Sequence, residues 1–366
     1  MGHHQHVSSC CMELGLRKTI QLETGRRQNN RCREQHVLQQ LFWECTLRCN
    51  LKCLHCGSDC KAVNGQKDMP LDDFLSVLDQ LPNIVNPNNV LVVTTGGEPL
   101  MRKDIDICGR EISKRGYIWG MVSNGMLLTD GKLKNLIDSG LQTIAISLDG
   151  FENEHNWMRG NSQSFSKAVN AIKALSSSPI TWDVITCVNK KNIAQLESFK
   201  RFLQNIGVKQ WRIFTVFPSG RAKDNDELQL DSSQMKWLMD FIVDVRKSRE
   251  MLLNYSCEGF LGTYEHEVRD YQFFCQAGIN VASIRNDGSI SGCLSIRSNY
   301  NQGNIYHDNF NEIWQNKFQV YRDHNWMKTG ECAECDMWRY CEGNGFHLRD
   351  ENGILMLCNL KRLEIK

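Results

Sequence analysis

Between residues 41 and 217, short apolar runs alternate with longer segments whose apolar residues recur at helical spacing. Continuous runs rich in β-branched and aromatic residues predict buried strands, whereas a period near 3.6 residues predicts amphipathic helices. The predicted strands are 41–45, 90–97, 117–125, 142–150, 180–188 and 209–217. The predicted helices are 70–81, 104–116, 131–140, 164–178, 193–207 and 231–250.

This alternation predicts the α/β class, with parallel strands joined by helical crossovers. The repeats are too few for a closed eight-stranded barrel, so we expect a partial (β/α)6 TIM-like barrel over residues 37–225. A helical connection over 226–270 is expected to follow. In such folds the chemistry lies in loops at the carboxyl ends of the strands. Four polar or cysteine-containing segments fall at such ends: 49–56, 96–98, 123–125 and 147–150.

The two ends of the chain lack this rhythm. Residues 1–36 are polar and without a steady period, which predicts a loosely ordered leader. Residues 271–366 predict a small cysteine-rich extension with a hairpin that turns at Asp287-Gly288. Beyond the hairpin we expect an amphipathic helix that buries Phe310, Ile313 and Trp314. Because the last part of the extension cannot easily bury a core alone, bound metal clusters would supply folding energy.

Charge and composition exclude several classes of function. Forty-three basic residues and forty-two acidic residues leave a net charge of +1, which gives no electrostatic footprint for nucleic acid. No apolar run approaches the ~18 residues of a membrane span, and the first residues lack the apolar region of a signal peptide. We therefore expect a cytoplasmic protein. In that compartment seventeen cysteines favour metal ligation over disulfides.

Three of these cysteines, Cys49, Cys53 and Cys56, are separated by three residues and then by two. Thiolates bind iron–sulfur clusters, zinc or copper(I). Structural zinc needs four closed ligands, whereas three thiolates would leave one iron of a four-iron cluster open for chemistry. His55 could serve as a zinc ligand, although packing beside a cluster is the simpler interpretation. The residues alone thus favour an iron–sulfur site and leave zinc open.

The segment CNLKCLHC at 49–56 resembles the CxxxCxxC signature of the radical S-adenosylmethionine (SAM) enzymes. The resemblance extends over about residues 40–360. Further motifs of this family follow in order at the predicted strand ends: GGEP at 96–99, SNG at 123–125, SLDG at 147–150 and then HNWMRG at 155–160. Each motif is weak alone, but their common order makes the resemblance specific.

The resemblance implies that the three cysteines hold a [4Fe-4S] cluster whose open iron binds the amino and carboxylate groups of SAM. Ser147 and Arg159 would hold the carboxylate, for which a guanidinium is well suited. One electron from a reductase, flavodoxin or ferredoxin would cleave SAM to a 5′-deoxyadenosyl radical that abstracts hydrogen from a substrate. The residues expected to contact SAM are Gly96, Gly97, Glu98, Pro99, Ser123, Asn124, Ser147, Asp149 and Arg159.

A second group of cysteines resembles the SPASM extension, which carries auxiliary iron–sulfur clusters. By this resemblance, one auxiliary [4Fe-4S] cluster would be held by Cys332, Cys335, Cys341 and Cys358. Zinc is the alternative for the C-x-x-C pair taken alone. Cys275 and Cys293 match half of a second site, because Gly345 stands where the family has another cysteine. This incomplete site is either empty or completed by Cys257 or by the substrate.

The SPASM resemblance implies a peptide or protein substrate that is modified after translation. Leu294 stands where sulfatase maturases have an aspartate after the ligand cysteine, which argues against formylglycine formation. The ending at 341–351 resembles a Bacteroidales subgroup linked with a lipoprotein partner. A small-molecule enzyme of cofactor biosynthesis is the alternative, which a closed apolar pocket would favour over an open groove. A non-enzymatic iron–sulfur or zinc scaffold is disfavoured, because Glu98 and Arg159 would have no purpose in it.

Overall fold

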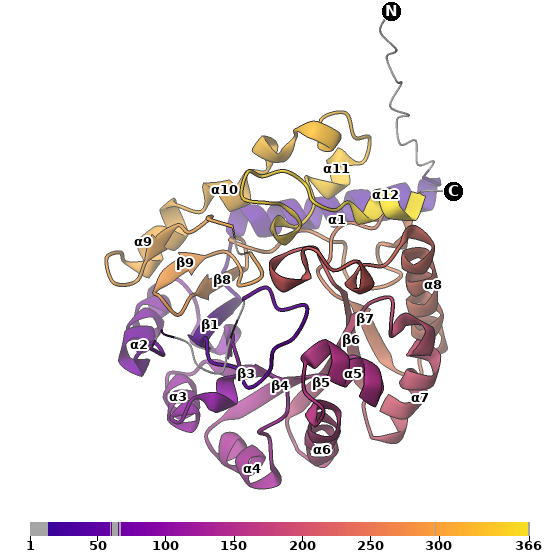
Figure 1. Ribbon diagram of the computed structural model, residues 1–366. Coiled ribbons are helices and arrows are strands. Elements are labelled where there is room, and N and C mark those ends of the chain that lie inside the picture. Colours follow the sequence, from indigo (N-terminus) through magenta and orange to yellow (C-terminus); the bar gives the residue numbers. More distant parts are fainter. Residues whose placement is uncertain (1–13, 59, 61–64, 66, 297, 365–366) are drawn as a thin grey trace, which may run out of the picture.

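The computed structural model describes residues 14–58, 60, 65, 67–296 and 298–364. Within these ranges, parallel strands run side by side in chain order from β1 to β7 (Figure 1). Their bounds are β1 Gln40–Thr46, β2 Leu91–Gly96, β3 Ile118–Ser123, β4 Leu141–Ser147, β5 Thr181–Val188, β6 Gln210–Thr215 and β7 Leu252–Tyr255. The α/β class and the partial TIM-like barrel predicted from the sequence are confirmed.

Helices cover the outer face of this sheet (Figure 1). They are α2 Leu71–Gln80, α3 Ile105–Lys114, α4 Asp130–Asp138, α6 Ser164–Ser176, α7 Leu196–Asn205 and α8 Ser232–Ser248. A further short helix, α5 Glu152–Arg159, follows β4 and ends at Arg159, a residue of the candidate site. Among the described residues no helix is both long and apolar enough to cross a membrane.

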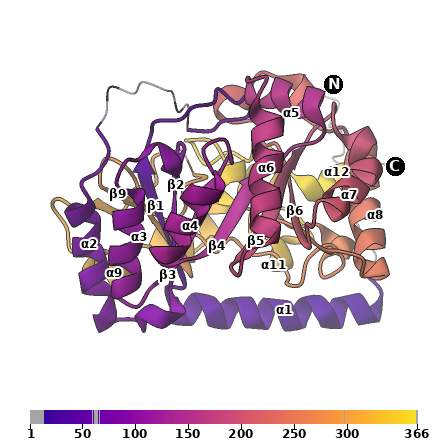
Figure 2. The same cartoon turned by 90° about the horizontal axis from the view of Figure 1, so that it is seen from below.

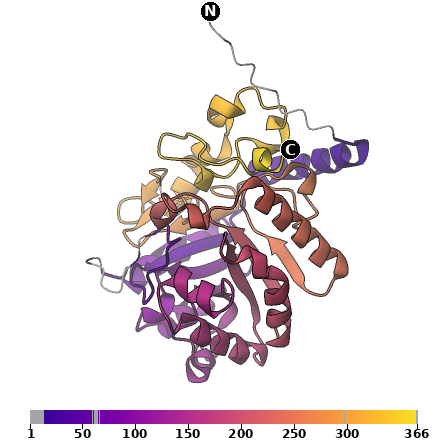
Figure 3. The same cartoon turned by 45° about the vertical axis from the view of Figure 1, so that its right-hand side comes forward.

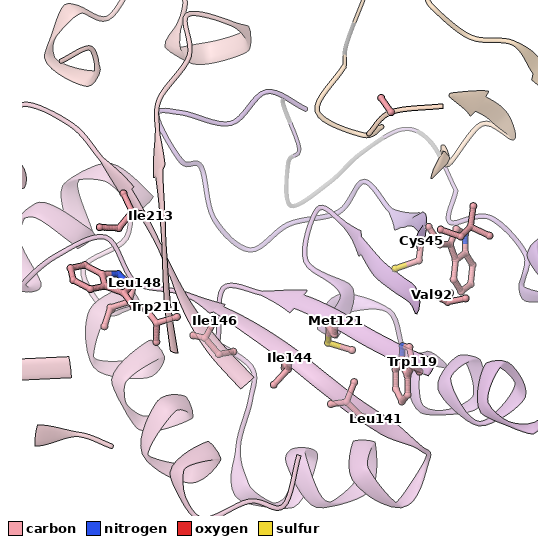
Figure 4. Close-up of a cluster of buried hydrophobic side chains, with 14 of the residues drawn as sticks. Cys45, Val92, Trp119, Met121, Leu141, Ile144, Ile146, Leu148, Trp211 and Ile213 are labelled. Carbon is pink, nitrogen blue, oxygen red and sulfur yellow. The ribbon is translucent and has the colours of Figure 1, made fainter. Parts of the chain in front are cut away.

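The core lies where strand side chains meet the covering helices, and Figure 4 shows part of it. Trp43 of β1 stacks on Phe74 of α2 with ring centroids 4.2 Å apart. Trp119 of β3 donates its indole N–H to Thr94 Oγ1 at 3.2 Å, so its polar atom is satisfied in the interior. This packing fixes the strand ends from which the candidate site is built.

The cysteine-rich extension continues the same sheet. Strand β8 (Val281–Ile284) pairs parallel with β1, and β9 (Ser289–Ser291) and β10 (Gly303–Asn304) follow in antiparallel order. Asp287 and Gly288 form the predicted turn between β8 and β9, and Phe310, Ile313 and Trp314 are buried as expected. The extension's helices are α9 Phe310–Asn316, α10 Gln319–Arg322, α11 Trp338–Cys341 and α12 Asn359–Glu364. Figure 3 shows that the extension lies against one side of the barrel.

The prediction of a loosely ordered leader is wrong for Leu16–Gln35, which form helix α1 (Figure 2). The helix has no apolar stripe, since its only buried residues among those described are Leu22 and Asn29. Leu22 packs in a buried apolar cluster with Phe260 and Phe273, and two distant ion pairs, Arg33 with Glu342 and Arg339 with Glu23, add to this contact. Residues 1–13 of the predicted leader lie outside the described residues.

Two further elements differ from the sequence-based prediction. The segment 226–270 contains the expected helix α8, but it also adds β7 to the edge of the sheet beside β6. The four residues of β7 are too few to show a strand pattern. Helix α5 is short and mostly polar, and the left-handed Gly160 (φ +67°) ends it.

Candidate functional site

The GGEP turn after β2 holds the loop that leads into Cys49. The backbone N–H of Gly97 donates to Thr46 O at 2.8 Å, and that of Glu98 donates to Arg48 O at 2.8 Å. A Cβ atom on Gly97 would lie 2.2 Å from Arg48 O, so only glycine permits this approach. The GGEP motif therefore positions the loop that carries the CNLKCLHC motif.

Glu98 joins the ends of β2 and β3. Its buried carboxylate accepts hydrogen bonds from Ser123 Oγ at 2.8 Å, from the backbone N–H of Asn124 at 2.8 Å and from that of Leu100 at 3.1 Å. Burial raises the pKa of Glu98 although these bonds oppose the shift. The Asn124 side chain then donates to Asn50 Oδ1 in the cysteine loop at 2.8 Å. Three of the predicted contact residues, Glu98, Ser123 and Asn124, thus form one hydrogen-bonded network that contacts the cysteine loop.

Arg159 and Asp149 form a buried ion pair beside Cys53. Arg159 Nε donates to Asp149 Oδ2 at 2.6 Å, and Arg159 Nη1 lies 3.7 Å from Cys53 Sγ. Burial alone would raise the pKa of Asp149, but the charges of Arg159 and His155 outweigh it and hold that pKa at about 2. The guanidinium is therefore fixed as a cation against the cysteine loop.

Several groups fix Asp149 in turn. Its Oδ1 accepts from the backbone N–H of Cys187 at 3.0 Å, and its carbonyl oxygen accepts from Asn192 Nδ2 at 2.6 Å. Its backbone N–H donates to His155 Nδ1 at 3.0 Å, and His155 Nε2 meets Ser164 Oγ at 2.9 Å. Sequence reasoning missed His155 and Asn192 as supports. His155 lies within a quoted motif, whereas nothing in the sequence around Asn192 indicates its role.

Pro99 and Ser147 lie at the same ends of the strands. Pro99 is buried and begins the short helix η3 (Pro99–Met101) directly after Glu98. Ser147 is the last residue of β4, is half-buried and pairs with Ile185 of β5. Gly96, with a φ of +122°, is the last residue of β2. The structure thus brings all the predicted SAM-contact positions to one end of the barrel.

The three clustered cysteines are set in a closely packed loop. Burial raises the pKa of Cys49 to about 12 and also raises that of Cys53. A hydrogen bond from the Cys60 thiol is the main cause that lowers the pKa of Cys56 to about 5. The Cys60 thiol thus contacts a candidate ligand.

His55, between the second and third of these cysteines, has a buried Nδ1 without a hydrogen-bond partner among the described residues. An unpaired buried nitrogen is costly unless another group completes its contacts. Such an atom, set between two candidate thiol ligands, fits a site that a bound group completes. The residues present therefore fit an iron–sulfur cluster with a ligand beside it.

The extension gathers four more cysteines around one cavity of about 540 Å³. It is lined by Cys332, Cys335, Cys341 and Cys358. Burial, followed by the charges of the other three thiols, raises the pKa of Cys341 well above its usual value. Arg349 Nη2 lies 3.5 Å from Cys332 Sγ and also donates to Gly343 O at 2.8 Å. Sequence reasoning predicted the four thiols but not this guanidinium.

A second cavity, of about 450 Å³, lies between the inner face of the barrel and the extension. Apolar strand residues such as Phe42 and Met121 line much of it. Asp183 and Arg212 form an ion pair in its wall, with Arg212 Nη2 donating to Asp183 Oδ1 at 3.0 Å. The remaining predicted thiols, Cys275 and Cys293, also line this cavity, together with Cys257.

None of the cysteines that the structure describes forms a disulfide bond. In the described ranges, moreover, no three His, Cys, Asp or Glu side chains converge as ligands of a single metal ion.

Comparison with known proteins gives family matches over both regions. A model of the radical SAM superfamily matches residues 43–203, and a model of the SPASM iron–sulfur cluster-binding domain matches residues 275–336. The first range contains the motifs from Cys49 to Arg159. The second contains Cys275, Cys293, Cys332 and Cys335, whereas Cys341 and Cys358 lie beyond it.

Relatives with different activities share most of the chain. An AdoMet-dependent heme synthase from Nitratidesulfovibrio vulgaris is 26% identical, over 88% of this chain and 92% of the relative. The mycofactocin maturase MftC of Mycolicibacterium smegmatis is 28% identical, over 83% and 76%.

The fold also resembles that of Streptococcus suis SuiB. The SAM-bound SuiB structure gives a TM-score of 0.67 at 17% identity, over 88% of this chain and 76% of SuiB. SuiB bound to its precursor peptide SuiA gives a TM-score of 0.64 at 18% identity, over 91% and 78%. At such identities the likeness establishes the fold and not the substrate. The chain is a radical SAM enzyme, whose cofactors are a [4Fe-4S] cluster and SAM, with a C-terminal SPASM domain that binds iron–sulfur.

Proposed function

We propose that Cys49, Cys53 and Cys56 hold the catalytic cluster and that SAM binds beside them at the carboxyl ends of the strands. The observation that carries this proposal is the Arg159 guanidinium, which Asp149 fixes 3.7 Å from Cys53 Sγ. When bound, the cluster and SAM supply a 5′-deoxyadenosyl radical that abstracts hydrogen from a substrate.

The protein's own residues would bind SAM, orient it beside the cluster and exclude water from the site. Arg159 offers a fixed cation for the carboxylate of SAM, and Ser147, the last residue of β4, would add a hydroxyl donor. Gly97 and Glu98 keep the cysteine loop against β2, so that the cluster and the strand ends hold a constant geometry. Because these groups are buried, their interactions are stronger than they would be in water.

The same reasoning assigns the four thiols of the first cavity to one auxiliary [4Fe-4S] cluster. Arg349 would donate to a ligand sulfur of that cluster. We place the reaction in the cytoplasm, with a reductase, flavodoxin or ferredoxin as the electron donor.

We propose a peptide or protein as the substrate. The SPASM domain, the maturase MftC and the peptide-bound SuiB support this class. One residue of the peptide would enter the cavity between barrel and extension. The Asp183–Arg212 pair there offers an acceptor and donors side by side, which suits a peptide amide or a carboxylate.

A small molecule of cofactor biosynthesis is the second candidate. The largely apolar cavity of about 450 Å³ favours it, since small-molecule sites typically measure about 300–1,000 Å³. The heme synthase relative, which this chain spans over 92% of its length, also supports it.

Deuterium transfer distinguishes the two candidates. Extracts of the source cells, grown on a deuterated medium, are divided by size into a protein-and-peptide fraction and a small-molecule fraction. Each fraction is added to the reduced enzyme with SAM, and 5′-deoxyadenosine is analysed by mass spectrometry. Label from the first fraction, lost after protease treatment, supports a peptide substrate. Label from the second fraction alone overturns it in favour of a small molecule.

A further inference from the structure

We propose that Cys257, Cys275, Cys293 and His347 form a second auxiliary iron–sulfur site, in which His347 takes the place left by Gly345. The four residues come from three separate parts of the chain, yet they line the same cavity against the barrel. Three thiols and an imidazole nitrogen are a complete set of four cluster ligands.

Cys257 supplies the third thiol from the barrel itself. It lies two residues beyond the end of β7, at the edge of the sheet where the candidate active site is built. Its side chain is exposed and is one of those that line the cavity. Cys257 lies eighteen positions before Cys275, the first cysteine of the SPASM pattern. The spacing of that pattern therefore does not include Cys257.

His347 occupies the space that a side chain at position 345 would need. A Cβ atom built on Gly345 would lie 2.8 Å from His347 Cε1 and 3.0 Å from His347 Nδ1. The backbone N–H of Phe346 donates to the Cys275 thiol, which places this turn directly against a candidate ligand. The imidazole therefore stands at the position from which the missing cysteine would have reached the site.

One nitrogen of the His347 imidazole is available as a cluster ligand. The His347 side chain is 8% exposed, and its Nε2 has no hydrogen-bond partner among the described residues. Glu258 Oε2 lies 3.9 Å from this nitrogen, which is too long for a hydrogen bond. The Phe217 ring packs edge-on at 5.0 Å and holds the imidazole in place. An unpaired buried nitrogen is costly, and a metal bond would satisfy it.

The same donors could in principle bind one zinc ion, since three cysteines and a histidine are a familiar zinc set. Cys275 and Cys293 lie within the range that the SPASM iron–sulfur model matches, which favours a cluster over a single zinc ion. Replacement of thiolate by imidazole raises the potential of iron–sulfur centres. The second auxiliary cluster would thus be easier to reduce than the four-thiolate cluster at Cys332.

Iron counting after anaerobic reconstitution tests the number of sites. The full chain is expected to hold about twelve irons, and a Cys49→Ala/Cys53→Ala/Cys56→Ala variant about eight. Cys257→Ala in that variant should lower the count to about four, whereas Cys108→Ala, a buried thiol in α3, should leave about eight. About four irons in the triple variant would overturn the second auxiliary site. An unchanged count after the triple substitution would instead count against the proposed catalytic cluster.

Pulsed electron paramagnetic resonance tests the histidine. The triple variant is produced with 15N-histidine, reduced, and examined for hyperfine coupling to one imidazole nitrogen. The coupling should vanish in His347→Gln and persist in His324→Gln, a buried histidine of the same extension. No imidazole coupling in a chain that carries eight irons would overturn the role of His347. One zinc per chain at this site, lost in Cys257→Ala, would overturn the cluster.

Discussion

Arg159 Nη1 lies 3.7 Å from Cys53 Sγ, although 106 positions separate the two residues in the sequence. The contact exists because the cysteine loop packs against the end of α5, where the backbone N–H of Leu54 donates to Met158 O at 2.8 Å. The candidate cluster ligand and the candidate SAM-carboxylate ligand are therefore parts of one packed unit.

Arg159→Lys is expected to weaken SAM binding by about 10–100-fold. Lysine keeps the charge that Asp149 needs, but it loses the forked donor geometry, and a hydrogen bond between charged groups contributes about 1.5–3 kcal/mol. Equilibrium dialysis with the reconstituted protein measures the affinity. Arg110→Lys, on the exposed side of α3, is the matched control. Unchanged affinity in Arg159→Lys would remove this residue from the SAM site.

Gly97→Ala is expected to prevent cluster assembly at the first cysteine loop. The added Cβ would lie 2.2 Å from Arg48 O, so the loop must leave its position against β2. Gly57→Ala is the control, because a Cβ at Gly57, in the same loop region, meets nothing within 4 Å. Iron content and visible absorption check the outcome. Normal iron in Gly97→Ala would show that the close approach is dispensable.

Asp149→Asn is expected to destabilise the protein by about 3–5 kcal/mol, since it leaves the buried Arg159 without its counter-charge. Urea unfolding of the protein prepared without iron, compared with wild type, provides the measurement. Asp138→Asn, an exposed pair with Lys134 on α4, should change stability by less than about 1 kcal/mol.

The pH dependence of that difference has a fixed sign. Folding lowers the pKa of Asp149 from 3.8 to about 2, so the folded state binds fewer protons than the unfolded state. The stabilisation is fully present above pH 3.8 and is lost as the pH falls toward 2. The gap between wild type and Asp149→Asn should therefore shrink over this range. A gap that grows on acidification would contradict the assigned ion pair.

Arg349→Gln is expected to lower the reduction potential of the auxiliary cluster at Cys332. The substitution removes a positive charge and a donor from a ligand sulfur, both of which favour the reduced, more negative cluster. Redox titration followed by electron paramagnetic resonance measures the potential, in a chain without the first three cysteines. Arg339→Gln, whose side chain pairs with Glu23 on the surface, should leave the potential unchanged.

The barrel and the order of its motifs could be predicted because strand and helix periods are local properties of the sequence. Helix α1 could not, since its place depends on contacts with distant residues, such as the packing of Leu22 on Phe273 and the ion pair of Arg33 with Glu342, which lie 309 positions apart. Strand β7 is similarly decided by pairing with β6 rather than by its four residues.

The candidate site shows the same division. The thiols of CNLKCLHC have a recognisable spacing. Arg159 is recognisable because its motif, HNWMRG, follows the predicted end of the fourth strand. His347 and Arg349 carry no spacing signal, and Cys257 is one of three alternatives that the sequence leaves open. The fold brings Cys257 and His347 to the cavity that Cys275 and Cys293 also line, and it places Arg349 against Cys332 Sγ.

The most direct test of radical chemistry is the formation of 5′-deoxyadenosine. The reconstituted protein is reduced anaerobically with dithionite, supplied with SAM and the substrate fraction identified by deuterium transfer, and analysed by chromatography. The account predicts 5′-deoxyadenosine from the wild type and none from Cys53→Ala. Equal product from both proteins, or none from a wild type with full iron content, would contradict it.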